Sequence, residues 1–168
     1  MKTTRIFTYC LFSFLLFCFC ACESPVQSVI GEYSFKVSGQ VTKDGSDLLA
    51  LPDEMGTMDI IHLNDSNFLL TFNTLNGGAY TTEAVLSNKQ LNLHPFSRTI
   101  TLTHKSQSSD ILGGIIELTE TEHYSTDVYG YGTIYGETIK FTLQYSGEEL
   151  TNGKKIKGSN ILMLAKKN

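Results

Sequence analysis

The sequence contains no tryptophan, only three prolines and little charge. Charged residues make up 18% of its 168 residues, below the roughly 25% of an average soluble protein. The formal net charge is −4, and an acidic chain offers no basic surface for a phosphate backbone, so we expect no nucleic-acid partner. Because 41% of the residues are hydrophobic, the chain is too apolar to be disordered, and its length suits one domain.

Cysteine is absent after residue 22. The four cysteines are Cys10, Cys18, Cys20 and Cys22. If the segment before Cys22 is removed, this one cysteine stays in the mature chain. A disulfide, a thiol nucleophile, a thiol redox pair and a cysteine-type zinc site are then all excluded from the mature domain.

The first 22 residues predict export. Lys2 and Arg5 give a positive start, residues 6–19 form an apolar run, and the small residue Ala21 precedes Cys22. This order is typical of a secretory signal peptide. An uncleaved anchor helix and an ordinary signal peptide without lipid attachment are the alternatives.

The end of this segment, Phe19-Cys20-Ala21-Cys22, resembles the lipobox of bacterial lipoproteins. The resemblance implies cleavage before Cys22 and diacylation of its thiol. Residues 1–21 are then the signal peptide, and residues 22–30 are the lipidated cysteine and a polar tether. More than one acyl chain gives stable anchoring. We therefore expect a membrane-anchored protein of the bacterial cell envelope, in the outer membrane, with the membrane face left open.

From residue 31 onward, apolar and polar residues alternate, which predicts half-buried strands. Five segments show the alternation most clearly: 32–42, 67–74, 90–94, 98–104 and 138–145. Gly136-Glu137 predicts a two-residue hairpin, because glycine accepts the positive φ of a primed turn. A short helical turn is expected only within residues 44–51.

Short consecutive hairpins predict an all-β fold, an antiparallel meander of about 8–10 strands over residues 31–168. A meander of this size removes its open edges by closing on itself. We therefore expect a single β-barrel domain, with a two-sheet β-sandwich as the alternative.

Two segments, GEYSFKVSGQVT (31–42) and YGYGTIYGETIKFTLQY (129–145), resemble small lipocalin-like, or calycin-like, lipoproteins of Gram-negative anaerobes. The residues of the second segment that carry the match are Thr133, Ile134, Gly136, Thr138, Ile139, Phe141, Thr142 and Leu143. The buried tryptophan of the lipocalin opening signature is absent. The resemblance implies a lipocalin-like barrel more than it implies an activity, because a fold does not fix a function.

The inward face of such a barrel would line a pocket for one small apolar ligand. The candidate ligand-binding residues are Tyr33, Phe35, Phe68, Leu70, Phe72, Phe141, Leu143 and Tyr145. The same residues also describe a filled core. In that case we expect an interaction or accessory protein of the envelope without a small-molecule ligand. A row of tyrosines on one side of a predicted strand is the candidate interaction surface: Tyr129, Tyr131 and Tyr135.

No catalytic motif is present in the sequence, which lacks G-x-S-x-G, a P-loop and H-E-x-x-H. In the acidic segment 117–122, Glu120 and Glu122 share one strand face, a spacing compatible with calcium or with a glycosidase pair. A solvated strand face is the simpler interpretation. We therefore expect neither enzyme activity nor a cofactor.

The histidines predict no metal site. Four of them lie on different predicted strands: His62, His94, His104 and His123. A zinc site needs at least three ligands to converge, and none of the spacings in the sequence indicates such convergence. We expect histidines in solvent or at the barrel rim.

Overall fold

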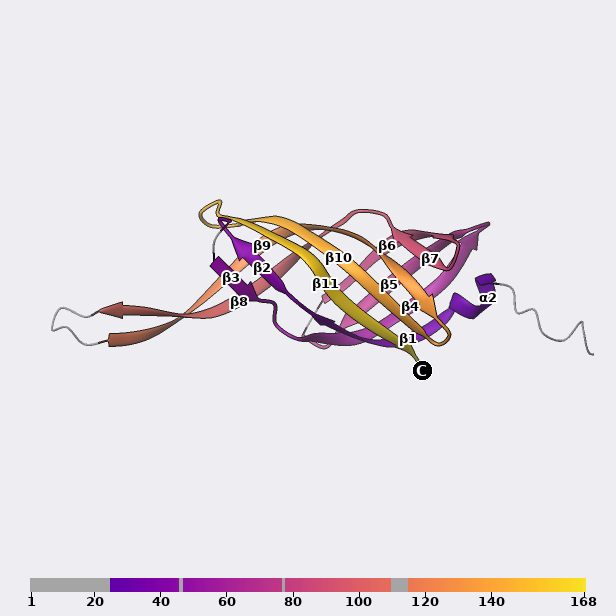
Figure 1. The fold of residues 1–168 in the computed structure, drawn as a ribbon, viewed down its shortest axis with the longest axis horizontal. Coiled ribbons are helices and arrows are strands. Elements are labelled where there is room, and N and C mark those ends of the chain that lie inside the picture. The colour runs from indigo at the N-terminus through magenta and orange to yellow at the C-terminus, as the bar shows by residue number, and fades with distance from the viewer. Residues whose placement is uncertain (1–24, 46, 77, 110–114) are drawn as a thin grey trace, which may run out of the picture.

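A computed structural model describes residues 25–45, 47–76, 78–109 and 115–168 (Figure 1). The predicted signal peptide, 1–21, and Cys22 lie outside the described residues. The described elements are helix α2 (Pro25–Val29) and strands β1 (Gly31–Ser38), β2 (Gln40–Lys43), β3 (Asp47–Ala50), β4 (Glu54–Asn64), β5 (Asn67–Thr74), β6 (Gly78–Ser87), β7 (Gln90–Leu93), β8 (Phe96–Ser109), β9 (Ile115–Tyr135), β10 (Thr138–Glu149) and β11 (Lys155–Lys167).

Eight strands close into an antiparallel barrel. Their order is β1-β4-β5-β6-β7-β9-β10-β11, and β11 pairs back onto β1. The pairing of Phe35 in β1 with Ala165 in β11 lies within this closing register. A closed ring of hydrogen bonds confirms the predicted all-β, lipocalin-like barrel and excludes the two-sheet sandwich.

The alternating residues point into the barrel as expected. Tyr33, Phe35 and Val37 of β1 are buried, and so are Phe68 of β5 and Phe141 of β10. Burying a phenylalanine side chain contributes about 1.5–3 kcal/mol to folding, so these residues supply much of the core's stability.

Gly132 in β9 makes room for the ring of Phe141. A Cβ atom on Gly132 would lie 2.6 Å from Phe141 Cε1, too close for any real contact. Gly132 therefore serves packing on the inner face of the barrel. Gly136 has a φ of 59° and turns the predicted hairpin between β9 and β10.

The barrel wall is complete at one end and split at the other. The backbone N–H of His94 donates to Glu83 O at 2.8 Å. Pro95 follows and separates strand β7 from strand β8. Proline has no N–H for a sheet ladder. Within the described chain β7 pairs with β6 and β9, whereas β8 pairs with β9 alone. We call the part of the barrel that β7 completes the closed half, and the part lined by β8 the split half.

The β8–β9 pair continues beyond the barrel as a two-stranded arm (Figure 1). The register runs from Thr103 opposite Thr121 to Ser109 opposite Ile115. Helix α2 lies at the other end of the molecule (Figure 1).

Two segments differ from their predicted structure. Residues 25–29, expected in a polar tether, form α2, with Val29 buried in the core and its carbonyl accepting from Tyr33 OH at 2.9 Å. The helical turn predicted within residues 44–51 was wrong: residues 47–50 form β3, which pairs with β2. Asp44 and Gly45 have positive φ and turn that hairpin. None of the helices in the described part of the chain has the length and apolar character needed to cross a bilayer.

Candidate functional site

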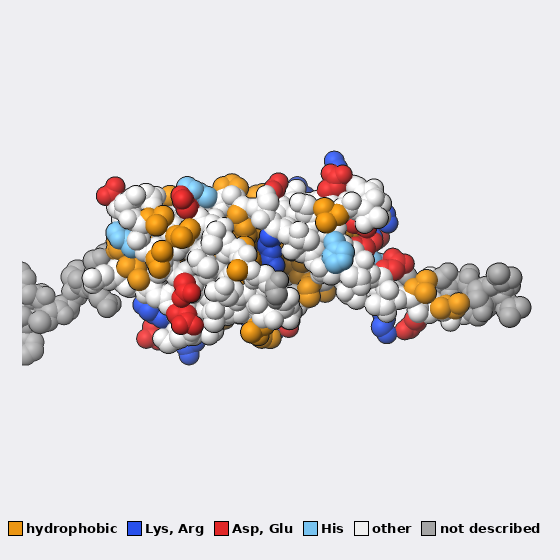
Figure 2. Space-filling model, turned by 180° about the vertical axis from the view of Figure 1, so that it is seen from behind, with side chains coloured by type: hydrophobic (Ala, Val, Ile, Leu, Met, Phe, Trp, Pro, Cys, Tyr) orange, Lys and Arg blue, Asp and Glu red, His pale blue; other side chains and the backbone are white. Residues whose placement is uncertain are grey.

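A pocket of about 480 Å³ opens in the split half of the barrel wall. Its lining comes from the β3–β4 connection, the β5–β6 turn and the edge of β8, with Tyr145 of β10 behind them. Figure 2 shows a hollow near the middle of one face, with a basic side chain recessed in it. Among the described residues of the pocket lining, Arg98 is the only Lys or Arg. The pocket therefore lies in the part of the wall where β8 does not pair with β6.

Arg98 is largely buried at this pocket and contacts side chains of two other strands, β4 and β6. It occupies an inward position of β8, between the inward side chains of Phe96 and Ile100. Its Nη2 donates to Glu54 Oε2 at 2.7 Å, and its Nη1 donates to Tyr80 OH at 3.1 Å. The Arg98 and Glu54 side chains are 14% and 15% exposed. Burial by itself would lower the pKa of Arg98, but Tyr80 and Glu54 outweigh it and raise that pKa, so the guanidinium stays charged.

A column of aromatic rings supports the guanidinium. The Arg98 Cζ atom lies 4.5 Å from the centroid of the Tyr80 ring. Tyr80 stacks on Phe72 with ring centroids 4.7 Å apart, and on Phe96 with centroids 5.3 Å apart. Stacked rings and a cation over a ring face are each favourable by about 0.5–1.5 kcal/mol. This packing fixes the side chain of Arg98 in one orientation.

Glu54, in the pocket lining, has one carboxylate oxygen that the described residues leave without a hydrogen-bond partner. Glu54 Oε1 is shut off from solvent and has no hydrogen-bond partner among the described residues. A buried acceptor without a partner costs about 1–3 kcal/mol, so this oxygen favours a ligand that donates a hydrogen bond. Tyr145 is also buried, and burial raises the pKa of its phenol to about 12, which keeps it neutral at physiological pH.

Of the eight predicted ligand-binding residues, the structure places one at this pocket. Tyr145 is in the pocket lining. The other seven are buried in the core: Tyr33, Phe35, Phe68, Leu70, Phe72, Phe141 and Leu143. Phe72 contributes indirectly, through its stacking on Tyr80.

Sequence reasoning missed Arg98 and Glu54. The signal was present in β8, where Arg98 stands at an inward position in an otherwise apolar series, Phe96, Ile100 and Leu102. A charged residue at such a position must be paired or solvated, because burying an isolated charge is very unfavourable. The partner on β4 could not be identified, because nothing in the sequence states which strands meet across the barrel.

The tyrosine row lies on the outer face of β9. The exposed fractions of Tyr129, Tyr131 and Tyr135 are 37%, 41% and 63%. Their cross-strand neighbours in β10 are polar, with Gln144 opposite Tyr129 and Thr142 opposite Tyr131. The structure therefore brings these three residues together on one surface, as the sequence predicted.

Three of the histidines are exposed, at His62, His94 and His123. His104 differs, because its side chain is only 22% exposed and lies beside Glu120 and Glu122. The acidic segment and one histidine thus come together, which the spacing in the sequence did not indicate.

Comparison with known proteins gives few relatives. No protein family matches the chain, and no curated protein matches it either. Among solved structures, a redesigned β-barrel, mFAP1, described as bound to DFHBI, is 11% identical with a TM-score of 0.39. The match covers 84% of this chain and 98% of that one. A second redesigned β-barrel, b11L5F_LGL, is 10% identical with a TM-score of 0.38, and the match covers 88% of this chain and 98% of that one. What the pocket binds must therefore be inferred from the residues of this chain.

Proposed function

We propose that this protein is a lipid-anchored, lipocalin-like barrel of the bacterial cell envelope that binds one small ligand in the pocket of its split half. The observation that carries the proposal is a pocket of about 480 Å³ lined by a charged Arg98 and by Glu54, whose Oε1 has no hydrogen-bond partner within the described part of the chain. Ligand pockets of roughly 300–1,000 Å³ combine apolar walls with a few fixed polar groups. We propose a binding role and no catalytic one.

The pocket lining favours a ligand with an apolar body and one N–H or O–H group. Val37, Leu51 and Ile100 supply apolar surface. Glu54 Oε2 is already held by Arg98, so the ion pair is neutral as a unit and a neutral donor at Oε1 adds no uncompensated charge. The second acid at the rim, Asp53, is paired with Lys36 at 2.7 Å.

The membrane anchor is proposed from the sequence, through lipidation of Cys22. The described chain begins with α2 at the barrel end opposite the β8–β9 arm (Figure 1). A lipid attached three residues before Pro25 would therefore hold the α2 end near the membrane. Replacing Cys22 with serine should abolish acyl labelling and membrane retention; retention at the parent level would contradict lipid anchoring.

Binding can be tested with N-phenyl-1-naphthylamine, a neutral apolar dye that carries one N–H donor. The full-length protein in mild detergent should bind one dye per chain, measured by fluorescence. Asn76, in the β5–β6 turn, lines the pocket and is exposed, so Asn76→Trp should block the pocket without disturbing the core and weaken binding at least about 10-fold. Thr81→Trp, on the exposed face of β6 and outside the pocket lining, is the matched control and should bind like the parent.

Glu54→Gln tests the acceptor itself. An amide leaves the shape nearly unchanged but weakens the accepted hydrogen bond, since bonds to charged groups contribute about 1.5–3 kcal/mol. We expect weaker dye binding with unchanged stoichiometry. Equal affinity in the parent, Asn76→Trp and Glu54→Gln would place the dye elsewhere and refute the pocket.

A second candidate function is an envelope interaction or accessory protein. The exposed tyrosine row of β9 favours it, because aromatic residues are enriched at protein interfaces. Replacing Tyr129 and Tyr131 with serine should remove a partner captured from the native envelope while leaving the melting temperature nearly unchanged. Capture that persists in this variant would exclude the tyrosine row as the interface.

A further inference from the structure

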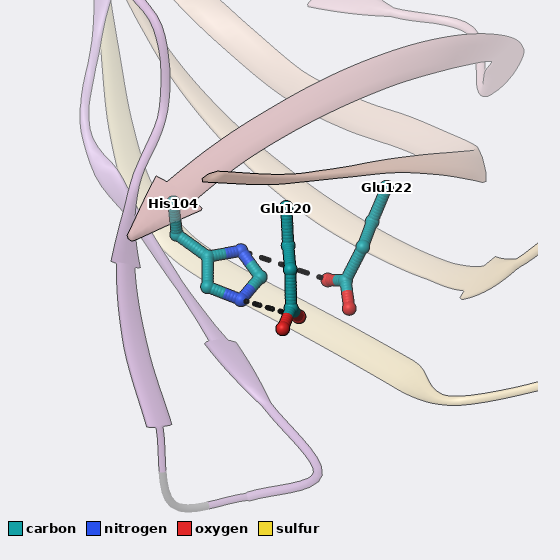
Figure 3. A group of neighbouring side chains, drawn as sticks. All are labelled: His104, Glu120 and Glu122. Atoms are coloured by element: carbon teal, nitrogen blue, oxygen red, sulfur yellow. Dashed lines mark ion pairs between the residues drawn. The ribbon is translucent and has the colours of Figure 1, made fainter. Parts of the chain in front are cut away.

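At the base of the arm, one histidine and two glutamates lie side by side (Figure 3). His104 of β8 is directly opposite Glu120 of β9, and Glu122 is two residues further along the same face. His104 Nε2 lies 3.4 Å from Glu120 Oε2, and His104 Nδ1 lies 4.0 Å from Glu122 Oε2. One ligand atom from each residue lies within 4.8 Å of the others. The three side chains thus converge from two paired strands.

We propose that His104, Glu120 and Glu122 bind one divalent transition-metal ion, with Zn²⁺ as the ion that suits them best. Imidazole nitrogen and carboxylate oxygen are both zinc ligands, at about 2.0–2.2 Å from the ion. Two such atoms around a tetrahedral ion lie about 3.4 Å apart, so the His104–Glu120 separation already fits. Calcium and magnesium prefer oxygen ligands alone, and the imidazole disfavours them.

Glu122 is held in an ionised, oriented state. Its side chain is 8% exposed, its Oε1 accepts from Lys43 Nζ, and its Oε2 accepts from Tyr124 OH at 2.6 Å. Burial by itself would raise the pKa of Glu122, but the hydrogen bonds from Lys43 and Tyr124 outweigh it and lower that pKa. Hydrogen bonds of this kind orient the carboxylate ligands of metal ions in other proteins.

Two buried polar atoms beside this cluster have no hydrogen-bond partner in the described part of the protein. One is His104 Nδ1, which would carry the ring proton when Nε2 binds the ion and which lies 4.0 Å from Glu122 Oε2. Glu149 is 7% exposed, and its Oε2 likewise has no hydrogen-bond partner within the described ranges. Buried polar atoms in native proteins nearly always have partners, so unpaired ones point to a group that the protein binds.

Glu149 also explains how Lys43 can tolerate an ion beside it. The charge of Glu149 acts on Lys43 and on Tyr124, the two residues that hold Glu122. Glu122 and Glu149 therefore both act on one lysine ammonium group. The two positive charges of an ion bound to Glu122 would offset the excess negative charge of these two carboxylates.

The test is a titration of the full-length protein, stripped of metal with a chelator and held in mild detergent, with ZnCl₂ by calorimetry. We expect one Zn²⁺ per chain. Glu120→Gln and His104→Ala should each weaken binding at least about 10-fold. The Glu120 side chain is 48% exposed, so Glu120→Gln should fold normally, which a thermal melt would check. Co²⁺ in place of Zn²⁺ should give visible absorption bands that are lost in the same variants.

His94→Ala is the matched control. His94 Nδ1 lies 3.7 Å from Glu83 Oε2, and the two side chains are 54% and 56% exposed. An exposed His–Glu pair of this kind should contribute nothing to the affinity for Zn²⁺. The control should therefore bind Zn²⁺ like the parent. Binding that is unchanged in Glu120→Gln and His104→Ala, or equally weak in all four proteins, would overturn the site. Displacement of Zn²⁺ by equimolar Ca²⁺ would overturn the choice of metal class.

Discussion

The two halves of the barrel interior differ in chemistry although β9 and β10 run through both. In the closed half the inward positions of β5 and β10 hold fully buried apolar side chains, among them Phe68, Leu70 and Phe141. In the split half the inward positions hold the Arg98–Glu54 and Lys43–Glu122 ion pairs. Buried charge therefore occurs on the side where the wall is open, and the other side is an apolar core.

This difference separates stability from function within one fold. A buried ion pair is often no more stabilising than apolar residues of the same size, because both charges lose their water. The split half therefore gains little stability from its charges. We infer that these charges serve binding, and that the closed half holds the barrel together.

The largest effect is expected in the closed half, from Phe141→Ala. Removing a buried phenylalanine ring costs about 3–5 kcal/mol of unfolding free energy, through lost burial and the cavity left behind. Urea denaturation measures it, with Lys140→Ala on the exposed face of the same strand as the control, expected within about 0.5 kcal/mol of the parent. A loss below about 1 kcal/mol in Phe141→Ala would show that the closed half is not the stabilising core.

A smaller loss is expected in the split half, from Arg98→Met. The substitution leaves Glu54 buried beside its pocket without its cation, and breaking a buried pair costs up to about 3–5 kcal/mol. Because both side chains keep some exposure, we expect about 2 kcal/mol. The double variant Glu54→Gln with Arg98→Met should recover at least half of this loss. If it recovers nothing, the two residues are not energetically coupled.

The sequence predicts the two halves unequally. Alternation identified the inward residues of β1, β5 and β10, because in a strand every second side chain faces the same way. Gly136 predicted the β9–β10 hairpin for an equally local reason, its positive φ. Local rules of this kind are enough to predict the buried residues of the closed half, because the inward positions there are apolar.

The split half depends on contacts between distant residues. Arg98 meets Glu54 across 44 positions of sequence, and Lys43 meets Glu122 across 79. Neither pairing leaves a local pattern. Residues 44–51 were predicted to contain a helical turn because Leu48 and Leu49 follow a possible Asp or Ser cap, and only the pairing of Leu49 with Val41 decides for a strand.

Alkaline pH should weaken the barrel through Tyr145. Burial raises the pKa of this phenol to about 12, above the value of about 10 of an unfolded tyrosine. The folded state therefore binds the proton more tightly, and stability is complete below pH ~10 and falls as the pH rises through ~12, by roughly 3 kcal/mol at most. Tyr145→Phe should reduce the loss of unfolding free energy between about pH 9 and about pH 12. Urea denaturation at these two pH values measures the loss. An unchanged slope would show that Tyr145 does not titrate differently in the two states.

Acid should open the split half before the closed half. We expect the change in stability to be smaller than the change at alkaline pH. The pKa of Glu122 is lowered in the folded protein, because Lys43 and Tyr124 outweigh the effect of burial, whereas an unfolded glutamate has a pKa of about 4.3. The stability from this shift is present above pH ~4.3 and is lost as the pH falls through the folded pKa.

Amide hydrogen exchange measures the two halves separately. At pH ~3 we expect the opening free energy of β9 amides near Glu122 to drop relative to that of β5 amides near Phe68. Glu122→Gln removes the titrating group and should abolish this difference between neutral and acid pH. If both halves lose protection equally in the parent, the split half does not open on its own, and the two halves unfold as a single cooperative unit.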